Sequence, residues 1–153
     1  MAEIKIKSEI KTLIACHSDY FKVNPNWEIN PFDIEISIKG PLDSPYEGGE
    51  FRLKFLFTLN FPFKPPTVKF ITKIYHPEID SSGRICSECF LYDWGTKDII
   101  LGLLNKILKI LKNPSSNCYI FADATELFVT DRYLFNSLAA EWTRQYGVCR
   151  NII

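Results

Sequence analysis

The sequence predicts an α+β domain in which an antiparallel sheet is followed by a group of helices. Between residues 32 and 70, apolar residues alternate with polar ones in three runs, the period of a strand with one buried face. Beyond residue 100, apolar residues recur instead at the three- and four-residue spacing of amphipathic helices. Strands clustered together, then helices clustered together, are typical of this fold class.

The first expected element is an amphipathic helix of about three turns near the N-terminus. Its inward face comprises Ile6, Ile10, Leu13 and Ile14. A looser stretch over about 24–31, rich in Asn and Pro, follows this helix. The first strand is expected over 32–38, and the second, over 51–57, is expected to pair with it antiparallel across a turn-rich connection. A short third strand covers 68–70.

Three helical stretches are expected in the second half. The first, over 100–111, has a clean apolar stripe, and Thr96 is a candidate N-cap for it. A short helical piece around 122–128 precedes a last helix, which Thr130-Asp131 opens and Gly147 closes. The inward face of that last helix is expected to comprise Phe135, Leu138, Ala139, Trp142 and Tyr146.

Length and composition indicate an ordinary globular protein, and we expect residues 1–153 to fold as a single domain. Eighteen basic and eighteen acidic residues give a formal net charge of zero, which argues against nucleic acid or an anionic membrane as a partner. No apolar run has the length of a membrane span, and the mixed-charge start does not resemble a secretory signal. The five scattered cysteines are therefore expected to be reduced thiols in a cytoplasmic or nuclear monomer.

The segment over about 74–96 is where we expect the chemistry. It is long and shows neither helical nor strand periodicity, and such stretches inside a compact domain are usually functional or disordered. Its many aromatic and aliphatic residues argue against disorder. It also contains His76, Cys86 and Cys89, which are one of the two histidines and two of the five cysteines.

Cys86 and Cys89 form a Cys-x-x-Cys pair that admits several interpretations. A thioredoxin-like redox pair would lie at the start of a helix in a βαβ unit, and this sequence offers neither. A structural zinc site needs four ligands, and His17, His76 and Cys118 are isolated from one another. We therefore expect no metal here, and we interpret Cys89 as a small buried apolar residue.

A third interpretation makes Cys86 a lone nucleophile. A thiol on a partly exposed turn can attack an activated acyl group and hold it as a thioester. A cysteine protease would also need a histidine base and an orienting residue. His76 supports that role poorly because Pro77 follows it directly in what resembles a rigid turn. A nucleophile without a neighbouring base fits acyl exchange between thiols.

These residues resemble the active-site segment of ubiquitin-conjugating enzymes. In that family a His-Pro-Asn motif begins ten residues before the catalytic cysteine, and a tryptophan follows the cysteine by eight. His76-Pro77, Cys86 and Trp94 have both spacings. Further similarity, in the same order along practically the whole chain, lies in Gly40-Pro41, Ser44-Pro45-Tyr46, Gly48-Gly49, Phe61-Pro62-Phe63-Lys64-Pro65-Pro66, Thr130-Asp131-Arg132 and Glu141-Trp142-Thr143.

The resemblance implies the α/β-roll of this family, with an N-terminal helix, a four-stranded antiparallel meander and C-terminal helices. It implies that Cys86 accepts ubiquitin or a ubiquitin-like modifier from an activating enzyme and passes it to a substrate lysine or a ligase cysteine. ATP is consumed by the activating enzyme, and no metal or organic cofactor takes part. By position, Lys5 on the first helix would meet the activating enzyme, and Phe63, Gly95 and Thr96 would meet the ligase.

Three positions depart from the family pattern. Glu78 replaces the motif asparagine, whose amide is thought to steady the loop and to donate to the oxyanion that forms during transfer. Because an ionised carboxylate cannot donate, Glu78 is expected either to be protonated or to turn away toward backbone amides. Gly95-Thr96-Lys97 is also atypical, which leaves the ligase class open. Asn117 is a candidate to orient the incoming amine, whereas Cys118 is expected to be a packing residue.

The resemblance also assigns structural roles at the site to His76, Pro77 and Trp94. A rival hypothesis is a binding module of the same fold, which holds ubiquitin or a partner without productive transfer. The presence of Cys86 favours the enzyme, and Glu78 favours the module, because loss of one oxyanion donor slows a reaction by about 10²–10³.

Overall fold

The computed structural model describes residues 1–16, 19–86, 91, 94–95, 100–115 and 118–148. Helix α1 (Ala2–Ala15) is followed by the strands β1 (Phe21–Val23), β2 (Asp33–Lys39), β3 (Glu50–Leu56) and β4 (Thr67–Phe70). A 3₁₀ turn, η1 (Pro25–Glu28), lies between β1 and β2. The second half forms the helices α3 (Ile100–Lys112), α4 (Ala122–Thr130) and α5 (Arg132–Tyr146).

Within the described residues, the four strands form one antiparallel meander in the order β1-β2-β3-β4. Ile36 of β2 lies opposite Leu53 of β3, and Leu53 lies opposite Phe70 of β4. These pairs place apolar side chains in a row across one face of the sheet. The predicted α+β class and the pairing of the two alternating runs are confirmed. Strand β1 has only three residues, too few for its alternation to be seen in the sequence.

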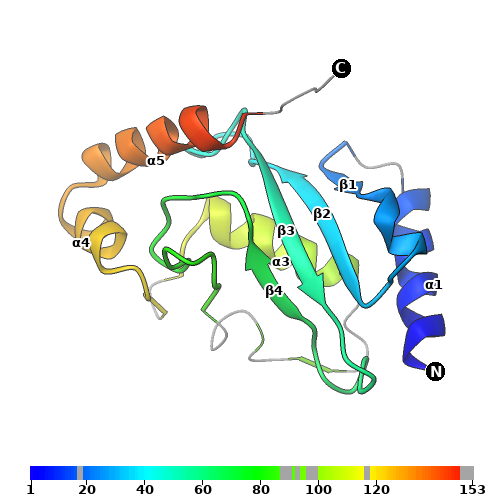
Figure 1. The fold of residues 1–153 in the computed structure, drawn as a ribbon. Coiled ribbons are helices and arrows are strands. Elements are labelled where there is room, and N and C mark those ends of the chain that lie inside the picture. The colour runs from blue at the N-terminus through cyan, green and yellow to red at the C-terminus, as the bar shows by residue number, and fades with distance from the viewer. Residues whose placement is uncertain (17–18, 87–90, 92–93, 96–99, 116–117, 149–153) are drawn as a thin grey trace.

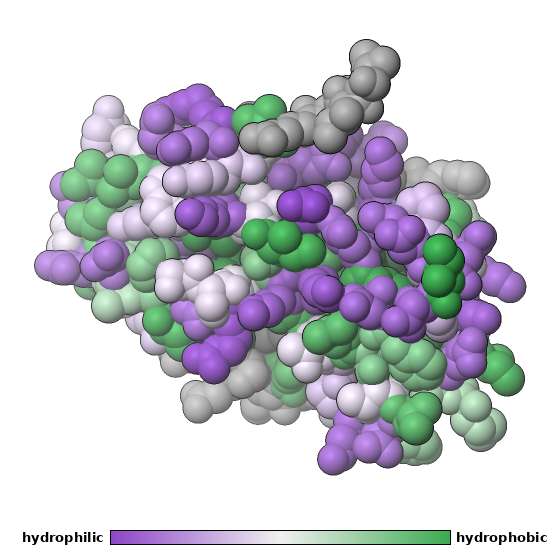
Figure 2. Space-filling view, viewed as in Figure 1, coloured by the Kyte–Doolittle hydropathy of each residue, from purple (hydrophilic) through white to green (hydrophobic). Residues whose placement is uncertain are grey.

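Helix α3 lies across one face of the sheet and covers it (Figure 1). Five residues of the predicted stripe are buried, namely Ile100, Leu103, Leu104, Ile107 and Leu111. Leu108, the sixth residue of that stripe, is only partly buried against the core. The five buried side chains belong to one core cluster with the inward residues of the strands, among them Ile34, Ile36, Ile38, Phe51, Leu53 and Phe55. The opposite face of the sheet carries many polar side chains (Figure 2), including the ion pairs Arg52–Glu35 and Lys54–Asp33.

A buried carboxylate connects α1 to α3. Glu9, on the inward side of α1, accepts a hydrogen bond of 3.1 Å from the backbone N–H of Ile100, the first residue of α3. A carboxylate at a helix N-terminus is favourable, because the first N–H groups have no partner inside the helix. Burial raises the pKa of Glu9, and this hydrogen bond and the nearby Lys5 ammonium oppose that rise.

Aromatic packing joins α5, and the N-cap residue of α4, to the chain segment after β4. The ring of Tyr75 contacts those of Phe121, Phe135 and Trp142 at centroid distances of 5.6, 5.6 and 5.2 Å. The hydroxyl of the buried Tyr46 donates a hydrogen bond of 2.6 Å to the backbone carbonyl of Tyr75. Tyr75 is thereby fixed from two sides, and it precedes the histidine of the predicted site.

Two residues predicted to face inward do not do so. Ile14 is 46% exposed, because it lies about 100° around the helix from Leu13 and falls past the edge of the buried stripe. Tyr146, in the last turn of α5, is 37% exposed. Asp131 is confirmed as the N-cap of α5, since its carboxylate accepts from the N–H of Leu134. No helix in the described part of the chain is both long and apolar enough for a membrane span.

Candidate active site

The chain after β4 folds back on itself before it reaches Cys86. The N–H of Phe70 donates to the carbonyl of Gly83 at 2.8 Å, so the turn at Gly83 lies beside the end of β4. Inside this turn Asp80 Oδ1 accepts from the N–H of Arg84 at 2.9 Å. Gly83 has φ +89°, which glycine adopts without strain. These contacts fix the direction in which the chain enters Cys86.

The peptide at Pro77 and Glu78 binds two different segments. The N–H of Cys86 donates to the carbonyl of Glu78 at 2.9 Å. The carbonyl of Pro77 accepts from the N–H groups of Ile120 and Phe121, at 2.8 and 3.1 Å. The segment that ends at Cys86 and the segment that leads into α4 are therefore both anchored on the same two residues.

His76 is fully buried and holds this segment against α3. Its Nδ1 accepts from the backbone N–H of Glu78 at 3.0 Å, so Nε2 carries the proton and donates to the carbonyl of Ile110 at 2.8 Å. Burial lowers the pKa of His76 to about 4, and the ring is neutral at pH 7. Because both ring nitrogens are engaged, His76 is placed as a loop-fixing residue rather than as a base for Cys86.

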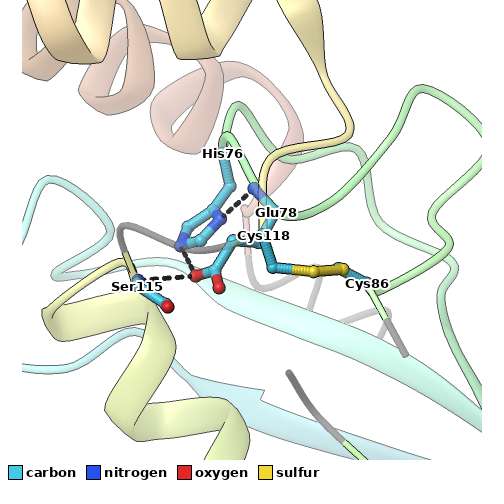
Figure 3. Close-up of a disulfide and its surroundings, with 5 residues drawn as sticks. All are labelled: His76, Glu78, Cys86, Ser115 and Cys118. Atoms are coloured by element: carbon cyan, nitrogen blue, oxygen red, sulfur yellow. Dashed lines mark hydrogen bonds and ion pairs between the residues drawn. A yellow bond between two sulfur atoms is a disulfide. The ribbon is translucent and has the colours of Figure 1, made fainter. Parts of the chain in front are cut away.

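The carboxyl group of Glu78 is buried, with 1% of the residue exposed. It turns away from the sulfur of Cys86 toward Ser115, whose N–H donates to Oε2 at 3.1 Å (Figure 3). The same oxygen lies 4.0 Å from Nε2 of His76, and among the described residues Oε1 has no hydrogen-bond partner. Burial raises the pKa of Glu78 to about 7, against the lowering effect of the Ser115 N–H. This orientation matches the second of the two expectations for Glu78.

Cys86 is joined to Cys118 by a disulfide (Figure 3). The expectation of reduced thiols is wrong for these two residues, and Cys118 is not merely a packing residue. Cys86 is 7% exposed rather than on a partly exposed turn, because its backbone is bonded to Glu78 on one side and its sulfur to Cys118 on the other. In this oxidised form its sulfur is not available to an acyl group.

Other predicted residues at the site are only partly described. Asn117, Thr96 and Cys89 lie outside the described residues. Gly95 is exposed. Cys16, at the end of α1, is a free and exposed cysteine, as expected of a reduced thiol.

Trp94 connects the predicted ligase-facing loops. Its Nε1 donates to the carbonyl of Pro62 at 3.0 Å, and its ring packs at a tilt against Phe61. This contact suits the structural role predicted for Trp94. Phe61 is 2% exposed, whereas Phe63, two residues later, is 77% exposed. Phe63 is therefore a surface residue, and its side chain is accessible to a partner.

Lys5 lies on α1, where its ammonium forms an ion pair of 3.5 Å with Glu9. Lys7 pairs in the same way with Glu3, at 3.1 Å. Only the second is a pair of solvent-accessible side chains, which contributes little to stability, because the Glu9 carboxylate is buried. The side chains of Lys5 and Lys7 are both partly exposed and therefore accessible to a partner.

Sequence reasoning missed the contribution of Ser115 and of the carbonyl of Ile110, which hold Glu78 and His76. Both act through backbone groups, so their side-chain types carry no signal. It also missed the pairing of Cys118 with Cys86. The two cysteines are 32 residues apart, and connectivity among five cysteines cannot be deduced from spacing alone.

The meander, the helix behind it and the buried histidine segment define an α/β-roll. Comparisons with known proteins identify the family to which this fold belongs. Residues 5–143 match the family model of ubiquitin-conjugating enzymes. A crystal structure from Plasmodium yoelii, described as that of a "putative ubiquitin conjugating enzyme", is similar with a TM-score of 0.90. It is 28% identical, and the match covers 97% of each chain. The chain belongs to the ubiquitin-conjugating enzyme family, whose members work with ubiquitin, activating enzymes and ligases.

Proposed function

We propose that this protein is a conjugating enzyme that accepts ubiquitin, or a ubiquitin-like modifier, as a thioester on Cys86. The observation that carries the proposal is the position of Cys86 in a chain of this family. It follows a buried His76-Pro77 by the family's spacing, and its N–H is bonded to the carbonyl of Glu78. The proposal concerns the dithiol form, in which the sulfur of Cys86 is free.

The surroundings of Cys86 favour acyl exchange over peptide hydrolysis. A cysteine protease uses a histidine as base for its nucleophile. His76, the histidine at this site, is neutral, and it donates to the carbonyl of Ile110 on the far side of the segment. Acyl exchange from another thioester needs less help, because the incoming acyl group is already activated. In this reaction the Cys86 thiolate attacks the thioester carbonyl, and the thiolate of the activating enzyme leaves.

The partners follow from the family and from the exposed residues. We assign the α1 face with Lys5 to the activating enzyme, and the surface around Phe63 and Gly95 to a ligase. The final acceptor is a lysine of a protein substrate or a cysteine of the ligase. Under this proposal the protein acts as a monomer in the cytoplasm or nucleus, and ATP is consumed by the activating enzyme.

The test begins with protein that has been fully reduced by dithiothreitol and then freed of it. This protein is incubated with activating enzyme, ATP and ubiquitin, and is resolved on a non-reducing gel. We expect an adduct that dithiothreitol removes, that is lost in Cys86→Ala and that persists in Cys16→Ala, the matched control at an exposed free cysteine. Parallel reactions with ubiquitin-like modifiers and their own activating enzymes identify the modifier.

The rival function, a binding module of the same fold, makes the opposite prediction for the same gel. Two observations favour the module: the Glu78 carboxyl group is bonded to the Ser115 N–H, and Cys86 is in a disulfide with Cys118. If the reduced wild-type protein gives no adduct with any modifier, the enzyme proposal is wrong and the module is favoured.

A further inference from the structure

The Cys86–Cys118 pair has a geometry that is set by the backbone around it. The two Cα atoms are 6.3 Å apart, within the range of about 4.4–6.8 Å that disulfides span. Both residues are buried, with 7% and 4% of their surface exposed. The two sulfurs lie against each other and come from different segments of the chain (Figure 3). Cys86 follows the turn at Gly83, and Cys118 lies in the segment that leads into α4.

Hydrogen bonds hold both segments in place without help from the disulfide. On the Cys86 side, the N–H of Cys86 itself is bonded to the carbonyl of Glu78. On the Cys118 side, the N–H of Ile120 is bonded to the carbonyl of Pro77, and the N–H of Ser115 to the Glu78 carboxylate. Since these anchors contain no sulfur, the two cysteines remain neighbours when the disulfide is opened.

We propose that Cys118 is the resolving thiol of a reversible disulfide with Cys86. Oxidation then makes the sulfur of Cys86 unavailable to an acyl group, and reduction makes it available again. This inference rests on the proposed function of Cys86. In the cytoplasm or nucleus, where we place the protein, disulfides are rare and usually transient or redox-sensing. A disulfide that includes the proposed nucleophile is therefore better explained as a regulatory disulfide, which controls the activity of Cys86, than as a structural one.

The chemistry balances with hydrogen peroxide as the oxidant. The Cys86 thiolate attacks one peroxide oxygen, the O–O bond breaks, and a sulfenic acid and hydroxide form. The Cys118 thiolate then attacks the sulfenic sulfur, the S–O bond breaks and hydroxide leaves as the disulfide forms. Two thiols and one peroxide thus give one disulfide and two waters. A dithiol reverses the process by thiol–disulfide exchange and becomes a disulfide itself.

The experiment exposes reduced full-length wild-type protein to increasing hydrogen peroxide and quenches it by alkylation. We expect peptide mapping to find a fragment that links Cys86 to Cys118, with the mass of two hydrogen atoms lost. The capacity of the protein to form a thioester with ubiquitin should fall in step with the appearance of that fragment. Dithiothreitol, removed before the assay, should restore most of the lost capacity.

Variants separate this inference from its alternatives. Cys118→Ala and Cys118→Ser, used together because the site is buried, should still accept ubiquitin when reduced. Without a resolving thiol they should progress to the sulfinic acid, which dithiothreitol does not reverse, at peroxide doses that leave wild type recoverable. Cys16→Ala should behave as wild type, because Cys16, at the C-cap of α1, takes no part in the disulfide.

Two outcomes would overturn the inference. The first is a wild-type fragment that links Cys86 to Cys89, or no linked fragment at all. The second is recovery of the Cys118 variants to the same extent as wild type. Failure of the proposed function looks different, because the fully reduced wild-type protein would then form no adduct before any peroxide is added.

Discussion

The buried carboxylate of Glu78 accepts a hydrogen bond of 3.1 Å from the backbone N–H of Ser115, 37 residues further along the chain. This bond ties the segment that precedes Cys86 to the start of the segment that follows α3. The family pattern has an asparagine at this position, and the longer glutamate reaches a backbone group instead. Glu78 is therefore a positioning residue in this chain, and its ionisation affects the stability of the protein.

The stability of a Glu78→Gln variant should depend on pH differently from that of wild type. Burial raises the pKa of Glu78 from 4.5 to about 7 in the folded protein. Between these values the folded protein keeps a proton that the unfolded chain has lost, so Glu78 lowers stability as pH rises. The variant lacks this loss. We therefore expect its stability relative to wild type to increase by on the order of 2 kcal/mol as the pH rises from 4.5 to 7.

His76 acts in the opposite direction and provides the internal control. Burial lowers its pKa from 6.5 to about 4, so the unfolded chain binds the proton first and stability rises with pH over that range. In wild type the two effects oppose each other, whereas Glu78→Gln retains only the rise from His76. Urea unfolding of both proteins at several pH values, in the same oxidation state, measures the difference. A difference that does not change with pH would show that the Glu78 pKa is not raised.

Replacement of Glu78 by asparagine should accelerate discharge of ubiquitin onto free lysine. The Glu78 carboxyl points away from the sulfur, toward Ser115, so it is not placed to donate to an oxyanion at Cys86 (Figure 3). An asparagine amide supplies such a donor, which is typically worth about 10²–10³ in rate. Single-turnover discharge from reduced, pre-charged protein measures the effect.

Glu78→Gln is the matched control for that experiment. It keeps the length of the side chain and the acceptor for the Ser115 N–H, and it is therefore expected to leave the amide turned away from the sulfur. Its discharge rate should stay close to that of wild type. Equal or slower discharge in Glu78→Asn would contradict our explanation of this position.

Two phenylalanines in the proline-rich loop should respond very differently to alanine. Phe61 is buried and packs edge-to-face on Phe57 at 4.9 Å, so Phe61→Ala should cost about 3–5 kcal/mol of unfolding free energy. Phe63 is exposed, so Phe63→Ala should change stability by less than about 0.5 kcal/mol. Urea denaturation compares the two. A large loss in Phe63→Ala would show that this side chain is not free for a partner.

Much of the fold could be predicted from the sequence, because the apolar residues on the buried face of a strand or helix recur at the period of that element. The alternation through Ile34 and Ile36 and the stripe through Leu103, Leu104 and Ile107 are buried as predicted. Ile14 is exposed, contrary to the prediction, because it lies about 100° around the helix from Leu13 and past the edge of the buried stripe. The periodicity does not predict strand β1, because its three residues are too few to show a period, whereas the four-stranded meander that the family resemblance implies includes it.

The site was only partly predictable, for a different physical reason. His76 and Cys86 carry chemistry in their side chains, so residue type and spacing point to them. The contacts that place them are largely backbone hydrogen bonds, from Ile110, Ile120 and Ser115, and any residue type can supply these. The partner of Cys86 depends on which segments meet in space, and only the tertiary structure supplies that.

The turn that leads to Cys86 should fail when a side chain is added at Gly83. This residue has φ +89°, and a Cβ built there would lie 2.0 Å from the carbonyl oxygen of Phe70. A backbone oxygen cannot move aside cheaply, and the positive φ adds strain of order 1–3 kcal/mol. We therefore expect Gly83→Ala to lose at least about 2 kcal/mol of stability and to slow thioester formation, because the segment that leads to Cys86 must shift.

Gly102→Ala is the control for that substitution. Gly102 lies inside α3, and a Cβ there meets nothing within 4 Å. Since glycine in a helix interior is about 0.5–1 kcal/mol worse than alanine, this variant should be more stable than wild type by a similar amount. Thermal unfolding and the rate of charging with ubiquitin, measured on both variants after full reduction, test the pair. If Gly83→Ala unfolds and charges like wild type, the turn does not govern the approach to Cys86.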